Sequence, residues 1–368
     1  MNRRAFVTGL GAVLAVPLAA GAQQAAKVWR IGWLGDGTRA ARESNTLTPL
    51  REGLRELGYI EGQNIVIDVR WSEGSEEQLK RDAADFVRRR VDVIVTHGGL
   101  GAIVAKKATA TIPIVVATAS DFIAAGLVTN LAHPGGNLTG TNDEAVEIAG
   151  KQVELLAEVI PRLQRVALFW DETNPTVKSL ARDLGVAARR MKVAVISVPL
   201  ARLEDLQPPV DRAVRERAQA IIVALGGWTL SNRARIVQAS LLRKLPVTSA
   251  SRLFADDGVL ASYGPDLPAV YKRASTFIDK ILRGTPPGDI PVEQPTKFEL
   301  IINLKTAKAL GLTIPPSLLL RADQIIEAVA RAGARQSVLT IPCLPFQSKL
   351  ADPYVPRVLE GAVRGCSV

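Results

Sequence analysis

The side chains that could bind a ligand follow short apolar runs of the chain. In the first half these candidates are Gly35, Asp36, His97, Gly98, Gly99, Leu100, Ser120, Asp121 and Phe122. Glycines let a ligand approach backbone N–H groups, and a helix beginning at Gly99 or Gly101 would offer its positive end to a carboxylate. Asp121 could hold a ligand ammonium group or cap a helix. His97 could donate to a ligand oxygen or simply fill the end of a strand.

The second half of the chain repeats this arrangement. Its candidates are Trp170, Asn174, Gly226, Trp228, Ser251, Arg252 and Tyr263. Only 5% of the residues are aromatic, so the placement of Trp170 and Trp228 just past strands predicts either a stacking wall for a flat ligand or packing between two lobes. Arg252 could pair with a carboxylate through both guanidinium nitrogens, or form a surface ion pair.

The pattern of the whole chain explains how these loops could meet. Short apolar runs alternate with helical patterns, which is typical of parallel sheets built from βαβ units. Strands are predicted at 28–34, 65–71, 91–96, 112–118, 165–170, 193–198, 220–225 and 246–249. Open sheets of this kind bind ligands beyond the carboxyl ends of their strands. The candidates from the two halves would therefore face each other across a cleft.

We predict two similar doubly wound α/β lobes from this pattern. The first spans 28–140 and the second spans 141–285. No Gly/Ser-rich linker separates them, so several short crossovers should form a hinge. A late segment of about 286–327 is expected to return to the first lobe.

Sequence signatures of enzymes and metal sites are missing. The chain has no G-x-x-x-x-G-K-[ST] and no G-x-S-x-G motif. The dinucleotide fingerprint fails because Gly99-Leu100-Gly101 leads to Val104 where a third glycine is needed. The histidines are His97 and His133 alone, and no Cys/His cluster has the spacing of metal ligands. We therefore expect no enzymatic activity, no cofactor and no metal.

Charge and cysteine content restrict the partners further. The net charge is +10, but basic and acidic residues are interleaved. A nucleic-acid partner would require basic charge clustered on one face, so none is expected. The two cysteines, Cys343 and Cys366, both lie near the end of the chain, which leaves the body without a disulfide.

The N-terminal residues predict export. An arginine pair, Arg3 and Arg4, precedes an uncharged run that ends on Ala20-Gly21-Ala22. This order is typical of a signal peptide over residues 1–22, cleaved near Ala22, and the arginine pair suggests the twin-arginine route to the periplasm. The alternative is a membrane anchor, although the run is shorter than the ~20 residues that a spanning helix needs. The segment 328–368 has little periodicity and is an atypical C-terminal tail.

Several longer motifs are characteristic of one family. They are the runs at 53–65, 132–140, 262–266, 291–316 and 320–323. With these motifs the chain resembles the substrate-binding proteins of ABC transporters, in the family that includes the TrpX tryptophan/tyrosine-type proteins. The resemblance covers about residues 28–327. It implies a type I periplasmic binding fold with three crossovers and a small ligand in the cleft between the lobes.

The resemblance also implies a function. We expect a periplasmic, monomeric solute-binding protein that closes around an amino acid, preferably an aromatic one, and docks on the permease of a transporter whose ATPase is a separate subunit. Asp121 would hold the amine, the amides of 98–100 the carboxylate, and Trp170 or Trp228 the side chain. The three loops 98–100, 120–122 and 226–228 depart from the family's usual Gly-Thr-Pro, Gly-Asp-Pro and Asp-Pro patterns, whereas Asp121 and Asn174-Pro175 match it. The alternatives are a ligand-sensing subunit of a membrane receptor, or a protein that binds a sugar or another small organic solute.

Overall fold

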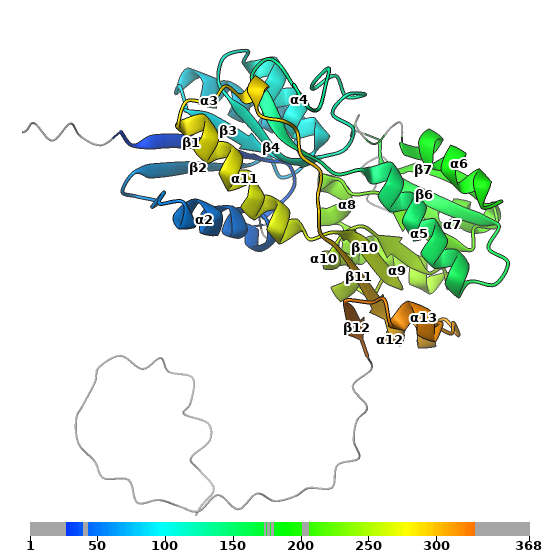
Figure 1. Cartoon of the computed structure of the whole chain (residues 1–368). Helices are drawn as coiled ribbons and strands as arrows, with labels where there is room; N and C mark the ends of the chain where they lie inside the picture. The colour runs from blue at the N-terminus through cyan, green and yellow to red at the C-terminus, as the bar shows by residue number, and fades with distance from the viewer. Residues whose placement is uncertain are drawn as a thin grey trace, which may run out of the picture. The chain divides into compact units, whose positions relative to one another are not determined.

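The computed structural model of the 368-residue chain describes residues 27–39, 43–172, 174, 177, 180–200 and 206–327 (Figure 1). The predicted signal peptide, Pro175 and the predicted tail lie outside this part of the chain. Within the described residues no helix combines the length and the apolar character needed to cross a membrane.

The first sheet consists of five parallel strands in the order β2-β1-β3-β4-β5. Its strands are β1 (Trp29–Gly35), β2 (Ile65–Trp71), β3 (Val93–Thr96), β4 (Ile114–Ala119) and β5 (Leu138–Asn142). The turn η1 (Glu43–Asn45) and the helices α2 (Leu47–Glu56), α3 (Glu76–Arg88) and α4 (Gly98–Ala108) connect the first four strands. Every residue of β3 and β4 is buried, which explains why these strands are continuous apolar runs in the sequence.

The second sheet has seven strands in the order β12-β11-β10-β9-β8-β6-β7. Its strands are β6 (Arg165–Asp171), β7 (Ala194–Leu200), β8 (Ala220–Val223), β9 (Val247–Ser249), β10 (Ala261–Pro265), β11 (Phe298–Asn303) and β12 (Gln324–Ile326). Only the pair β10–β11 is antiparallel among the described pairs of this sheet. The helices of this lobe are α5 (Ala145–Val159), α6 (Leu180–Arg190), α7 (Gln207–Arg215), α8 (Gly227–Ser231), α9 (Arg233–Leu242), α10 (Arg252–Asp256), α12 (Leu304–Ala309) and α13 (Pro316–Leu319).

Apolar cores cover both faces of the second sheet. Along β6, Leu168 and Trp170 belong to one buried cluster, whereas Ala167 and Phe169 belong to another. Neighbouring side chains of a strand point to opposite faces, so each face is packed against its own layer. The predicted doubly wound architecture is therefore confirmed.

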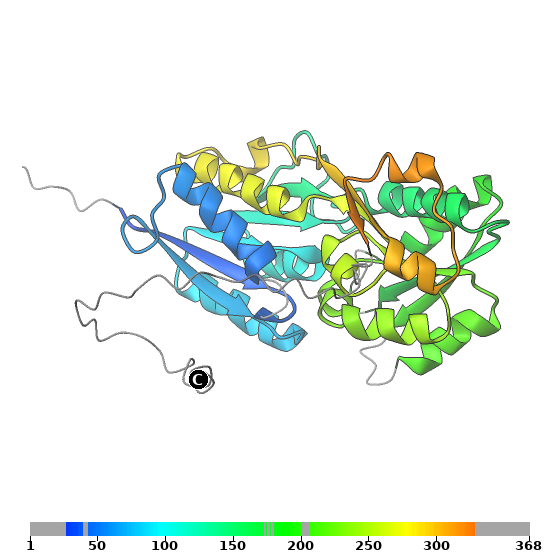
Figure 2. The same ribbon diagram turned by 90° about the horizontal axis from the view of Figure 1, so that it is seen from below.

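The segment after β10 differs from the prediction. The helix α11 (Leu267–Leu282) packs on the first lobe, where Tyr271, Phe277 and Ile278 are fully buried in the core that contains Ile31 and Trp33. Strands β11 and β12 extend the second sheet instead. Figure 2 shows α11 in yellow beside the blue and cyan elements, and α12 and α13 in orange beside the green ones. The expected return of 286–327 to the first lobe is wrong for β11 and everything after it.

The chain passes between the lobes three times, after β5, after β10 and before β11. The last passage follows η3 (Pro287–Asp289) and is tied to the first lobe by Glu293. Its backbone N–H donates to Gly140 and its carbonyl accepts from Asn142. Its carboxylate accepts two hydrogen bonds from Arg273, at 2.8 and 2.7 Å. This ion pair keeps the pKa of the Glu293 carboxyl below its usual value.

A second contact joins two of the three passages. Lys297 Nζ lies 2.6 Å from Asp266 Oδ2. The other oxygen of Asp266 accepts the N–H of Ala269 and caps α11. Two of the three passages are thus linked by an ion pair.

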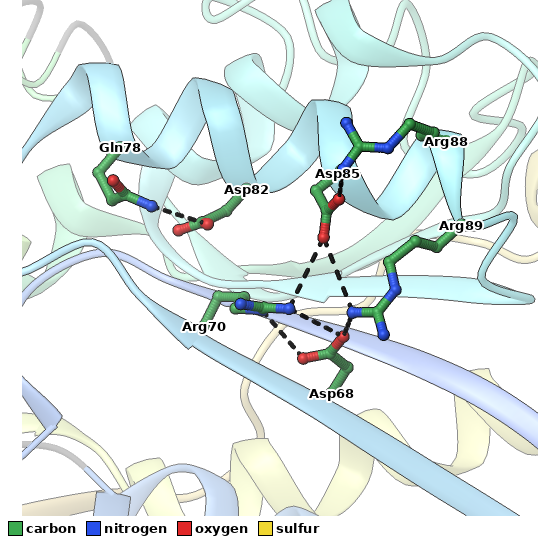
Figure 3. A network of polar contacts seen from close by, with 7 residues as sticks. All are labelled: Asp68, Arg70, Gln78, Asp82, Asp85, Arg88 and Arg89. Carbon is green, nitrogen blue, oxygen red and sulfur yellow. Dashed lines mark hydrogen bonds and ion pairs between the residues drawn. The ribbon is translucent and has the colours of Figure 1, made fainter.

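The free edge of the first sheet is covered by charges. On the edge strand β2, Asp68 and Arg70 pair with each other at 2.9 Å, and both contact Asp85 or Arg89 of the α3 region (Figure 3). Arg88 pairs with Asp85 in the same network. Charged side chains protect an edge strand from pairing with another chain. These groups are partly exposed, so each pair contributes at most about 1 kcal/mol to stability.

Short elements account for the remaining differences from the sequence prediction. The strand β5 and the helices α8, α10 and α13 were not predicted. Residues 122–126 form turns, and Asp121 directly before them has a left-handed backbone with φ of 45°. Elements of three to five residues carry too few side chains to show a period.

Candidate functional site

A cavity lies between the two lobes, beyond the carboxyl ends of their central strands. The first lobe lines it with the residues that follow β1, β3 and β4, and the second lobe with the end of β8 and the start of α8. The polar side chains among its described lining residues are Asp36, His97, Thr118, Ser120, Asp143, Gln152, Asn174 and Tyr271. Strand ends of open α/β sheets are the expected place for a ligand.

The first lobe contributes a buried acid–base pair. His97 Nδ1 lies 3.0 Å from Asp36 Oδ1, and the two residues are 0% and 6% exposed. The imidazole packs among three aromatic rings, those of Trp33, Trp71 and Tyr271, with centroids 5.6 to 6.2 Å away. Asp36 and the aromatic rings together hold the imidazole in place.

A second carboxylate lies where the chain leaves β5 for α5. Burial raises the pKa of the Asp143 carboxyl from 3.8 to about 6, although hydrogen bonds from Ser120, Thr118 and the Ala145 backbone act in the opposite direction. Sequence reasoning missed Asp143 because the strand before it was not predicted. The signal available was its position directly before the long helical pattern of α5.

The amino end of α4 also faces the cavity. Gly98 and Gly99 line it, and His97 at the N-cap position makes no capping bond with its side chain. Gly98 has a φ of 71°, and a Cβ built on it would lie 2.8 Å from Asp36 Oδ2. A side chain is excluded here by the nearby carboxylate, and the backbone of the first helical turn stays accessible to a ligand.

The two lobes touch directly at Asp36. A Cβ built on Gly227, the first residue of α8, would lie 2.9 Å from Asp36 Cγ and 3.0 Å from its Oδ2. The adjacent Gly226 is different, because its nearest atoms lie at 3.6 Å. Only a glycine at 227 lets the two lobes approach this closely.

The second lobe gives the cavity an apolar wall. Leu168 of β6 and Ile222 of β8 form its base, and Leu180 of α6 lies beside them. On the α5 side the wall consists of Ile148 and Ala149. All five are at most 5% exposed. The second lobe thus adds an aliphatic wall to the cavity, together with the polar side chains of Gln152 and Asn174, whereas the remaining polar side chains belong to the first lobe and to the passage after β5.

The structure brings together about half of the residues that the sequence singled out. Those that line this cavity are Asp36, His97, Gly98, Gly99, Ser120, Asn174 and Gly226. Leu100 and Trp228 line a smaller neighbouring cavity, which shares Asp36 and Asn174 with the first. The predicted residues outside both cavities are Gly35, Asp121, Phe122, Trp170, Ser251, Arg252 and Tyr263.

The aromatic residues in this last group have other contacts. Trp170 packs in the core of the second lobe, and its Nε1–H donates to Ser197 Oγ at 3.0 Å. Tyr263 stacks on Phe298 with centroids 5.9 Å apart. Phe122 is fully buried in the core of the first lobe. Trp170 therefore packs inside the second lobe, which is neither the ligand stacking nor the packing between lobes that the sequence left open.

The polar residues of the group act as caps or surface partners. Asp121 Oδ1 accepts the N–H of Ala124 at 3.0 Å, and Ser251 caps α10. Arg252 donates to Gln324 at 2.5 Å. Gly35 is covered by the indole ring of Trp71. The carboxylate that lines the cavity beside Ser120 is that of Asp143, whereas the sequence pointed to Asp121.

The arrangement is suited to holding a small molecule with both polar and apolar parts. Over the described residues no group of three or more His, Cys, Asp or Glu side chains could hold a metal ion. Two lobes that enclose a cavity at their hinge define a binding protein of the two-lobed α/β class.

Comparison with known proteins places the chain within this class. Residues 43–326 match the family model described as "ABC transporter substrate binding protein". The chain belongs to this family, as its motifs indicated. A tyrosine-binding protein of Clostridioides difficile (strain R20291) is 26% identical over 261 residues, which are 71% of this chain and 75% of that protein.

Solved structures show the same fold. A conserved domain protein from Vibrio cholerae has 27% identity and a TM-score of 0.77, covering 81% of this chain and all of the other. The ABC domain in complex with L-Trp from Streptococcus pneumonia has 26% identity and a TM-score of 0.76, covering 82% of this chain and all of the other. These matches confirm the type I periplasmic binding fold, and the fold and family are those of solute-binding proteins.

Proposed function

We propose that this protein is the extracytoplasmic solute-binding component of an ABC importer, and that it captures an α-amino acid between its lobes and delivers it to a permease. The observation that carries the proposal is the cavity, in which a buried carboxylate and the amino end of a helix lie on the polar side and an apolar wall lies opposite. The amino acids named for two relatives support the same class of ligand.

Each group of an α-amino acid has a partner of matching chemistry. Asp143 would accept hydrogen bonds from the ammonium group, because an opposite charge offsets the cost of burying the carboxylate. The N–H groups of Gly98 and Gly99 would bind the carboxylate at the positive end of α4. This moves the amine contact from the predicted Asp121 to Asp143.

Closure of the lobes would complete the site. Asp36 of the first lobe meets α8 of the second at Gly227, so the contact forms only when the lobes are together. Binding free energy would shift the protein to this closed form, which is the form that a permease can distinguish from the empty one.

A thermal-shift screen of the full chain, unfolded and refolded to remove bound ligand, tests the class of ligand. A compound at 100 times its dissociation constant stabilises the native state by about 2.7 kcal/mol, which raises the melting temperature visibly. We expect amino acids to act and sugars to have no effect. A sugar that stabilises the protein while all amino acids fail would contradict the proposal.

The role of Asp143 has a sharper test. Asp143→Asn should weaken binding of the amino acid at least tenfold but leave binding of its 2-oxo analogue, which lacks the amine, unchanged or stronger. Asp121→Asn, the matched control, keeps the cap of its turn and should bind the amino acid like the wild type. Equal losses in the two variants would refute the assignment.

A further inference from the structure

We propose that Gln152 is a specificity-determining residue, whose amide oxygen accepts a hydrogen bond from an uncharged donor on the side chain of the ligand. The ligands selected in this way are amino acids whose side chain carries a hydroxyl, an amide N–H or an indole N–H group. The inference rests on the proposed function, because it assumes an amino acid in the cavity between the lobes. It gives a role to a lining residue that the sequence did not single out.

The first reason is the fixed orientation of the Gln152 amide. Gln152 belongs to α5, is 2% exposed and lines the cavity. Its Nε2–H donates to the backbone carbonyl of Tyr263 in β10 at 3.0 Å. A carbonyl oxygen only accepts hydrogen bonds, so it holds the nitrogen of the amide on its own side and leaves the oxygen on the other. Turning the amide over would place two acceptors against each other.

The second reason is that the amide oxygen is accessible and lacks a donor. Among the described residues none donates a hydrogen bond to Gln152 Oε1. This atom is nevertheless not one of the unpartnered polar atoms that are sealed from solvent. Because Gln152 lines the cavity, the oxygen opens there. A ligand that covered it without donating would leave a buried acceptor unpaired, which weakens binding.

The third reason is the order of chemical groups along one face of α5. Ala145, Ile148, Ala149 and Gln152 all line the cavity, and their spacing of three and four residues puts them on one face of the helix. Asp143, the proposed amine contact, lies just before this face, and Gln152 ends it. An amino acid held by its ammonium group at Asp143 can thus lay its side chain on the apolar residues and present the far end to Gln152.

The charges of the cavity favour an uncharged donor at this end. Among the described lining residues the carboxylates are those of Asp36 and Asp143. Asp143 would hold the α-ammonium group, and Asp36 is paired with His97. A second cation at Gln152 would therefore be buried without an opposite charge, whereas a carboxylate would meet another acceptor. A neutral O–H or N–H group satisfies the amide oxygen without either cost.

Calorimetric titration of the refolded full chain with two pairs of L-amino acids tests the inference. Threonine and valine are similar in shape, as are tyrosine and phenylalanine, and only the first member of each pair carries a hydroxyl group. In the pair that binds more tightly, we expect the hydroxyl compound to bind at least tenfold more tightly than its partner, because a site built for a hydroxyl rejects the analogue that lacks it. A smaller preference, or none, would overturn the inference and leave the proposed function intact. If none of the four binds, the inference falls, and the thermal-shift screen shows separately whether any amino acid binds.

A variant of Gln152 separates contact with the ligand from a purely structural role. Gln152→Met keeps the length of the side chain but removes the acceptor, so the preference for the hydroxyl compound should fall below threefold. A structural role alone would weaken both members of the pair equally, and an unchanged preference would overturn the inference. The comparison of wild-type affinities decides if this variant fails to fold.

Gln219→Met is the matched control. Gln219 also donates to a backbone carbonyl of the second lobe, that of Arg162, but it is not among the described residues that line the cavity. The preference for the hydroxyl compound should therefore equal that of the wild type. If Gln219→Met loses the preference as Gln152→Met does, the effect does not come from contact with the ligand and the inference is overturned.

Discussion

Substituting Gly227 with alanine should weaken ligand binding by opposing closure of the lobes. The new Cβ would lie 2.9 Å from Asp36 Cγ, closer than non-bonded atoms approach. Asp36 has little room to move, because it is 6% exposed and His97 Nδ1 lies 3.0 Å from one of its oxygens. Overpacking of this kind costs about 1–3 kcal/mol.

The cost falls on the closed form alone, because Asp36 and Gly227 belong to different lobes. Every 1.4 kcal/mol changes a binding constant tenfold, so the dissociation constant should rise about 5- to 150-fold. Titration calorimetry with the amino acid that the wild type binds most tightly measures this change. The melting temperature of the ligand-free protein should stay close to that of the wild type, because alanine is a better helix former than glycine.

The neighbouring glycine provides the matched control. Gly226 has an extended backbone with φ of −165°, and a Cβ there meets atoms no closer than 3.6 Å. Gly226→Ala should therefore bind ligand as the wild type does. The reasoning is refuted if Gly227→Ala keeps wild-type affinity, or if Gly226→Ala loses as much as Gly227→Ala.

Two further predictions concern buried polar side chains. Because the pKa of Asp143 is raised from 3.8 to about 6 in the folded protein, the native state binds more protons than the unfolded state between these values, and stability should fall as the pH rises from 4 to 6. Asp143→Asn removes this dependence and should be more stable than the wild type at pH 7 by up to ~3 kcal/mol, as measured by urea unfolding at a series of pH values; a variant with the wild-type pH profile would contradict this. Trp170→Phe removes the hydrogen bond to Ser197 and should lower the free energy of unfolding by about 1 kcal/mol with no change in ligand affinity. A large loss of affinity in Trp170→Phe would restore Trp170 as a ligand contact.

Long elements of this chain were predictable because their patterns are strong. Strand β2 has the predicted bounds, 65–71. Most central strands are within two residues of theirs, because strands buried on both faces are unbroken apolar runs. The strand β5 was missed, since Thr139, Gly140 and Thr141 interrupt any such run.

The candidate site was predictable only by position. Sequence order shows which residues follow a strand, and the ends of parallel strands meet at one edge. It does not show which way a side chain turns. Trp170 and Asp171 are adjacent at the end of β6, but only the tertiary structure shows that the Trp170 ring enters the core on one face of the sheet. Asp143 lines the cavity because it follows strand β5, which the apolar pattern of the sequence did not reveal.

The sequence by itself determined the class of this protein: two α/β lobes, the loops that could bind a ligand, and a family. These depend on periodicity and on motifs, which are local properties of the chain. Tertiary structure decided that α11 packs on the first lobe, that Asp36 meets Gly227, and that the wall of the cavity is aliphatic. Such contacts join residues far apart in the chain. Their energies depend on shape and burial, which no local pattern records.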